Sequence, residues 1–176
     1  ELNNLKVLVI GETIIDQYVF CEALGKSGKE PVLVLRDLET QQYLGGVLAI
    51  ARHLSAFCKE ISVLSFLGEK REQETFIREN IKQNIKLNLL TKSNSPTIIK
   101  RRFLDKVDIN KVLGVYSIND DPLTKKDETK FIDAIDKLIE NHDLVIVSDY
   151  GHGIITSHIA EYISKTDKFV SLNTQV

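Results

Sequence analysis

The chain has 176 residues, of which 43% are hydrophobic and 27% are charged. A chain of this length and apolar content buries one substantial core, so we expect a single domain and no disorder. The 23 Lys and Arg residues nearly balance the 25 Asp and Glu residues, which argues against a nucleic-acid partner. The apolar runs are too short to span a bilayer and no signal peptide opens the chain, so we expect no membrane partner.

The cysteines indicate the redox environment of the protein, and the chain ends indicate whether the sequence is a whole protein or a part of one. Cys21 and Cys58 have no His or Cys at zinc-ligand spacing, which indicates reduced thiols in a cytoplasmic protein. The chain begins at Glu1, contains no methionine and stops at Val176, directly after an expected strand. We therefore expect a fragment or an excised domain.

In chain order, short apolar runs alternate with segments of helical periodicity. Strands are predicted at 5–10, 14–20, 31–39, 61–67, 85–90, 97–104, 111–118, 143–148 and 169–172, and helices at 47–57, 70–83, 124–141 and 155–164. Thr124, three residues before Asp127, predicts an acidic variant of the capping box at one helix start. This alternation predicts an α/β fold with a mostly parallel sheet covered on both faces. Segments 14–40 and 97–118 contain half-polar strands without helices, which predicts a small antiparallel flap.

Ligands of open α/β sheets bind beyond the carboxyl ends of the strands. Four features are expected there: Gly11-Glu12-x-x-x-Asp16, Gly45-Gly46, Asp149 with the following Tyr150–Gly153, and Asn173. Glycines at a helix start let backbone N–H groups approach a ligand, and Asp16 and Asp149 could accept hydrogen bonds from sugar-like hydroxyls. Taken singly, each feature is also typical of an ordinary turn after a strand. The chain has neither G-x-G-x-x-G nor G-x-x-x-x-G-K-[ST], so no dinucleotide fold or P-loop is supported.

Lys100 and Arg102 form a fifth feature. Alternate residues of a strand share a face, so these two cations point one way and Arg101 points the other. The pair could clamp an anionic group such as phosphate. The alternative is a solvated edge strand whose charges oppose aggregation.

The segments VLVIGETIIDQY, KEPVLVLRDLE, LGGVLAIARHLSAF, PTIIKRRFL and LVIVSDYGHGIIT follow one another in this order. Together, over nearly all 176 residues, they resemble the ribokinase-like (phosphofructokinase-B type) sugar kinases. Within these, the chain looks most like D-glycero-D-manno-heptose 7-phosphate kinase domains, which are often fused to a nucleotidyltransferase. The resemblance implies a Rossmann-like three-layer sandwich whose β-strand lid, about 14–40 and 97–118, covers the sugar. Residues 1–176 would be the N-terminal part of one kinase domain.

The resemblance also implies substrate-binding residues. The matching positions are Asp16 (sugar-hydroxyl acceptor), Gly45 and Gly46 (double glycine of the sugar pocket), Lys100 and Arg102 (basic lid positions) and Asp149 (aspartate of the S-D-Y segment). The chain departs from the family at three places: Ala49 replaces an Asn, His152 replaces a Lys, and Asn173-Thr174-Gln175 replaces Asp-Pro-Lys. These departures remove one hydrogen-bond partner of the sugar and two charges.

The family places its anion hole, its catalytic-base Asp and most of its ATP pocket in the second half of the domain. We therefore expect no catalytic residue and no metal site within this chain, with ATP and Mg²⁺ belonging to the full-length protein. The expected function is the sugar-binding portion of an ATP-dependent sugar or sugar-phosphate kinase, inactive as a fragment. A homodimer through the lid or an exposed sheet edge is expected. The alternative is a non-catalytic sugar-binding or dimerisation module derived from such a kinase.

Overall fold

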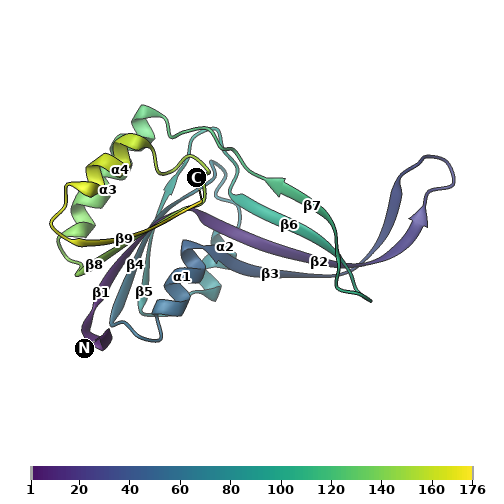
Figure 1. Ribbon diagram of the computed structural model, residues 1–176, viewed down its shortest axis with the longest axis horizontal. Coiled ribbons are helices and arrows are strands. Elements are labelled where there is room, and N and C mark those ends of the chain that lie inside the picture. The colour runs from purple at the N-terminus through teal and green to yellow at the C-terminus, as the bar shows by residue number, and fades with distance from the viewer. Residues whose placement is uncertain (1, 176) are drawn as a thin grey trace.

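The computed structural model describes residues 2–175 and contains two sheets (Figure 1). The main sheet has five parallel strands in the order β5-β4-β1-β8-β9. Their bounds are β1 Lys6–Gly11, β4 Glu60–Leu67, β5 Ile85–Thr91, β8 Leu144–Asp149 and β9 Phe169–Thr174, after a 3-10 turn at Leu2–Asn4.

Helices cover both faces of the main sheet because its inner strands are apolar on both sides. On β1, Val7 and Val9 pack towards α1 (Val47–Leu54) and α2 (Glu74–Asn80). The alternate residues Leu8 and Ile10 belong to the opposite core, which is closed by the remaining two helices: α3 (Lys125–Ile139) and α4 (Ser157–Ser164). The expected α/β sandwich is therefore confirmed. No helix among residues 2–175 combines the length and the apolar character needed to cross a membrane.

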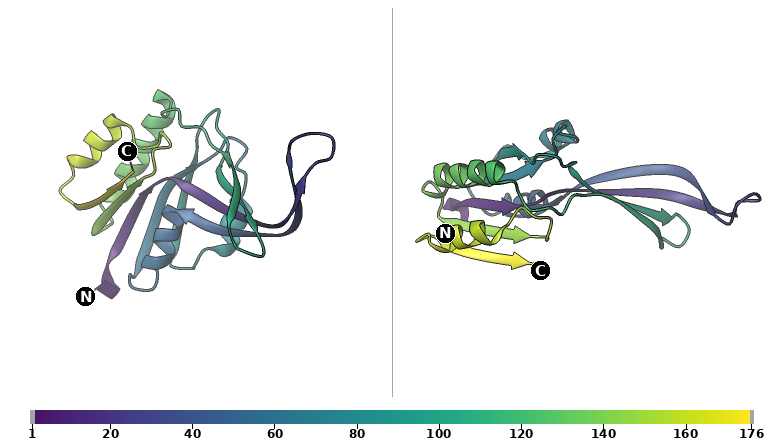
Figure 2. Two further views of the ribbon diagram at one scale, coloured as in Figure 1. Left: turned by 45° about the vertical axis from the view of Figure 1, so that its right-hand side comes forward. Right: turned by 90° about the horizontal axis from the view of Figure 1, so that it is seen from above.

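The second sheet is a long flap that stands away from the main domain (Figure 2). Its strands are β2 (Thr13–Lys26), β3 (Leu33–Gly46), β6 (Ile98–Asp105) and β7 (Lys111–Ser117), in the order β3-β2-β6-β7. The predicted antiparallel pairing holds for β6 with β7 and for β2 with β3, but the central pair, β2 with β6, is parallel. The expectation of an antiparallel flap was wrong in this respect. β2 and β6 both follow the carboxyl end of a parallel main-sheet strand, so they leave the domain in the same direction.

Two element boundaries differ from the prediction for local reasons. The helix expected at 70–83 is only α2, because Arg71 and Gln73 adopt positive φ values of 52° and 68° just before it. The strand expected at 31–39 continues to Gly46. Gly45 and Gly46 are therefore the last two residues of β3 and do not form a loop between the strand and the helix. The predicted cap of α3 is confirmed, since the Thr124 hydroxyl accepts a hydrogen bond from the Asp127 N–H at 3.2 Å.

Gly46 joins β3 to α1 in a conformation that suits only glycine. Its φ is 55° and its ψ is −138°. A Cβ at this position would collide with the backbone carbonyl of Glu12, which also accepts the N–H of Val47 at 3.0 Å. The start of α1 is therefore held against the β1–β2 connection by a contact that leaves no room for a side chain.

We predict that Gly46→Ala lowers the free energy of unfolding by at least about 2 kcal/mol, because backbone strain and the collision with Glu12 add together. Gly28→Ala is the matched control, since nothing lies near its Cβ, and its effect should stay within about 0.5 kcal/mol. Urea unfolding of both variants measures the difference. Equal stability of the two variants would show that the contact at Gly46 is relaxed at no cost.

Candidate functional site

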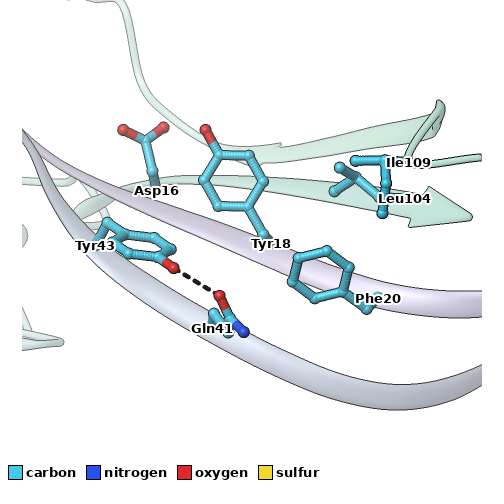
Figure 3. A pocket seen from close by; sticks show the side chains of 7 residues that line it. All are labelled: Asp16, Tyr18, Phe20, Gln41, Tyr43, Leu104 and Ile109. Carbon is cyan, nitrogen blue, oxygen red and sulfur yellow. Dashed lines mark hydrogen bonds between the residues drawn. The ribbon is translucent and has the colours of Figure 1, made fainter. Parts of the chain in front are cut away.

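One face of the flap carries a cavity of about 460 Å³ (Figure 3). Asp16, Tyr18 and Phe20 occupy alternate positions of β2 and therefore share this face. The other lining residues are Gln41 and Tyr43 of β3, Leu104 of β6 and Ile109 of the β6–β7 turn. The cavity thus has aromatic walls and a carboxylate at the end nearest the main domain.

The two tyrosines of the cavity are fixed by each other and by a neighbour. The rings of Tyr18 and Tyr43 meet edge to face, with centroids 5.7 Å apart. The Tyr43 hydroxyl donates a hydrogen bond to the Gln41 side-chain oxygen at 2.6 Å (Figure 3). These contacts present flat apolar rings beside a polar group, which is a common arrangement in small-molecule sites.

Asp16 is held by an ion pair with Arg102 of β6. The side chains of Asp16 and Arg102 are only 25% and 19% exposed, so solvent screens the pair less than it would at an open surface. The guanidinium also lies over the rings of Tyr18 and Tyr116, at 5.6 and 5.7 Å from their centroids. Arg102 therefore orients the carboxylate from one side and leaves its remaining lone pairs for other donors.

Gly45 completes the surroundings of Asp16. A Cβ on Gly45 would lie 2.5 Å from the Asp16 Oδ2 atom, so a larger residue would displace the carboxylate. Gly45 pairs with Ile14 across the β2–β3 ladder, two positions from the pair of Asp16 with Tyr43 and therefore on the same face. Glycine at this position keeps one side of the carboxylate open.

The structure brings together four of the residues singled out from the sequence: Asp16, Gly45, Lys100 and Arg102. The predicted alternation along 97–104 is confirmed, because Arg101 donates a hydrogen bond to Gln17 on the opposite face at 2.9 Å. Arg102 is engaged with Asp16. Lys100, by contrast, has neither an ion pair nor a side-chain hydrogen bond within the described part of the chain.

Asp149 lies apart from this group, at the carboxyl edge of the main sheet, and Gly46 ends β3 where the flap joins the main domain. The Asp149 carboxylate accepts hydrogen bonds from the Gly151 N–H at 2.9 Å and from the Thr174 hydroxyl at 3.3 Å. Gly46 contacts the Glu12 backbone, as described above. No hydrogen bond joins Asp149 to the flap among residues 2–175.

Glu12 also lies at this edge; the sequence named it only as part of the Gly11-Glu12-x-x-x-Asp16 feature and gave it no role of its own. It is fully buried, and its carboxylate accepts the N–H groups of Tyr150 at 3.0 Å and His152 at 3.3 Å. Burial raises the pKa of Glu12, and the nearby Asp149 carboxylate raises it further. An acidic residue directly after a buried strand was visible in the sequence, but its partners lie in a distant loop.

Lys92 fastens the same loop from the other side. Its ammonium group donates hydrogen bonds to the backbone carbonyls of Asn119 at 2.7 Å and His152 at 2.9 Å. Burial lowers the pKa of Lys92. The ring of His152 lies 2.7 Å from the Asp120 carboxylate and is largely buried, so the loop is rigidly positioned.

The described residues contain no cluster of metal-ligating side chains. No group of three or more His, Cys, Asp or Glu side chains among residues 2–175 could hold a metal ion.

We predict that Glu12 makes stability depend on pH. The pKa of Glu12 is raised in the folded protein above its ordinary value of 4.5. The folded state is therefore stabilised by protonated Glu12, and this stabilisation is lost as the pH rises from about 4.5 through the pKa of the folded protein. Glu12→Gln removes this titration, so the stability of the wild type relative to the variant should fall with rising pH across that window. Urea unfolding of both proteins from about pH 4 to about pH 8 measures the difference. A constant difference would contradict the raised pKa.

Comparison with known proteins gives relatives of partial length. No family model matches the chain. The chain is 26% identical over 176 residues to the bifunctional protein HldE of Campylobacter jejuni, which covers 95% of this chain and 34% of that protein. It is 25% identical over 151 residues to the D-beta-D-heptose 7-phosphate kinase of Bordetella bronchiseptica, covering 85% of this chain and 47% of that protein. The chain thus spans between a third and a half of the length of these curated relatives.

Solved structures share the fold over nearly the whole chain. The possible 1-phosphofructokinase of Thermotoga maritima superimposes with a TM-score of 0.70 at 16% identity, over 96% of this chain and 53% of that one. The ribokinase of Arabidopsis thaliana, complexed with ribose and ATP, gives 0.59 at 18% identity over 96% and 53% of the two chains. The predicted resemblance is confirmed by both kinds of relative, and this chain has the ribokinase-like α/β fold with its β-strand lid.

Proposed function

We propose that the chain is the sugar-binding portion of an ATP-dependent sugar or sugar-phosphate kinase, with a substrate resembling heptose 7-phosphate. The observation that carries the proposal is the placement of Asp16 at the end of an aromatic cavity, oriented by Arg102 and left open by Gly45. The names of the curated relatives, which include a heptose 7-phosphate kinase, support this substrate class.

In this proposal each group of the cavity has a physical task. The Asp16 carboxylate accepts hydrogen bonds from sugar hydroxyls, and such charge-assisted bonds are stronger than neutral ones. Tyr18 and Tyr43 pack against the apolar C–H face of the ring. Arg102 acts as a positioning residue, since it fixes the carboxylate.

We assign the catalytic base and the binding of ATP and Mg²⁺ to residues outside these 176. The support is the partial coverage: the chain spans 34% of HldE and 53% of the ribokinase chain. The word bifunctional in the name of HldE supports a fused nucleotidyltransferase in the full-length protein. Asp149 and Gly46 would then line the boundary between the sugar and the phosphoryl-transfer side.

A non-catalytic sugar-binding or dimerisation module is the second candidate. It is favoured by exposed apolar side chains, which are costly unless another surface covers them. Phe169 and Leu172 of the edge strand β9 are 72% and 63% exposed. On the flap, Leu33 and Leu113 are 53% and 52% exposed, so a homodimer could form at either place.

The first test is phosphoryl transfer. We expect the full-length protein to release ADP from ATP and Mg²⁺ when supplied with a sugar phosphate, and residues 1–176 alone to release none. A coupled assay over a panel of sugars and sugar phosphates, including sedoheptulose 7-phosphate, measures both. Activity of residues 1–176 alone would contradict the assignment of the base. Sugar binding without any turnover by the full-length protein would favour the non-catalytic module.

The second test concerns Asp16. Asp16→Asn should weaken sugar binding by the full-length protein roughly tenfold to a hundredfold, because a charge-assisted hydrogen bond is lost. Asp37→Asn is the matched control, since Asp37 lines a separate cavity on the opposite face of the flap with Gln17 and Arg101. Isothermal titration calorimetry with one sugar on both variants measures the contrast. Equal weakening would place the sugar elsewhere.

A further inference from the structure

A second cavity, of about 240 Å³, adjoins the first one at Tyr43. Its lining comes from three separate elements: Tyr43 and Leu44 of β3, Ala49, Arg52 and His53 of α1, and Lys82 of the segment after α2. β3 is the edge strand of the flap, so this cavity lies where the flap edge meets the main domain. Tyr43 forms a wall common to both cavities.

The polar lining of the second cavity is entirely basic apart from the Tyr43 hydroxyl. Residues 49, 52 and 53 are related by steps of three and four along α1 and therefore lie on one face of the helix. Ala49 contributes only a methyl group, which leaves space in front of Arg52 and His53. Lys82 approaches from the neighbouring segment, and no carboxylate lines the cavity.

The basic side chains of this cavity have no ion-pair or hydrogen-bond partner within residues 2–175. Arg52 differs in this respect from the other arginines: Arg36, Arg71, Arg78 and Arg102 are ion-paired, and Arg101 is hydrogen-bonded to Gln17. His53 and Lys82 likewise take part in no ion pair or side-chain hydrogen bond there. Positive charges gathered at one hollow without a counter-charge favour an anionic ligand.

The pair Lys100 and Arg102 on the flap, the other candidate for binding the phosphate, carries less unpaired positive charge than the second cavity. Arg102 is already neutralised by Asp16, which leaves Lys100 as the unpaired cation of that pair. The second cavity instead offers a guanidinium, an ammonium and an imidazole together. A guanidinium binds two phosphate oxygens at once, and a phosphate monoester carries a charge of about −1.5 to −2 near neutral pH.

We propose that the cavity of Arg52, His53 and Lys82 is an anion site that holds the phosphate group of a sugar phosphate. Its sugar ring then lies on the other side of Tyr43, at Asp16. The assignment of the sugar ring rests on the function proposed above. The charge of the cavity is an independent observation.

The test compares two ligands on the full-length protein by calorimetry: sedoheptulose 7-phosphate and sedoheptulose. The double variant Arg52→Gln with Lys82→Gln should weaken sedoheptulose 7-phosphate at least about tenfold and sedoheptulose by less than about twofold. The double variant Lys59→Gln with Lys126→Gln is the matched control. It removes the same net charge at exposed lysines that do not line the cavity.

Three results would overturn the inference. They are equal weakening of both ligands, equal effects of the cavity and control variants, and a larger phosphate-specific loss in Lys100→Gln. None of the three results tests whether the sugar ring binds at Asp16, which the Asp16→Asn experiment decides separately. If the wild type binds neither ligand, the proposed function fails. A titration with inorganic phosphate then tests the anion site by itself. Phosphate-induced NMR shifts at His53, abolished in the cavity variant, support the anion site, whereas their absence refutes it.

Discussion

The ion pair between Asp16 and Arg102 connects two strands that are 86 positions apart in the sequence. It lies between β2 and β6, the one parallel pair of the flap, and joins the β2–β3 hairpin to the β6–β7 hairpin. Because the guanidinium is also sandwiched near Tyr18 and Tyr116, the charge pair and the aromatic wall support each other. The shape of the candidate site therefore depends on a contact between the two halves of the flap.

The α/β sandwich could be predicted from the sequence, because buried parallel strands appear as short apolar runs and amphipathic helices as apolar residues at helical spacing. The alternation of residues along a strand separated Arg102 from Arg101, as observed, since the period of a strand determines which residues share its face. Tyr18 lies two residues after Asp16 on the same strand face. The same reasoning could therefore have predicted Tyr18 as a residue of the candidate site.

Other features could not be read from the sequence because they depend on contacts between distant segments. The parallel pairing of β2 with β6 follows from where both strands leave the main sheet. The partners of Glu12 are backbone N–H groups of a loop about 140 residues away, and backbone groups carry no sequence signal. The short α2 reflects Arg71, whose guanidinium reaches Glu74, Thr91 and the carbonyl of Leu89 across the fold.

The unequal lengths of the flap strands have a consequence for motion. The ladder between β2 and β6 ends at Cys21, so the outer parts of β2 and β3 pair only with each other. Nearly all residues between 22 and 40 are exposed there, and no core cluster includes them. A two-stranded ribbon of this kind can open and reclose without disturbing the packed domain. The distal hairpin is thus a separate unit of local unfolding, attached to a base that stays folded.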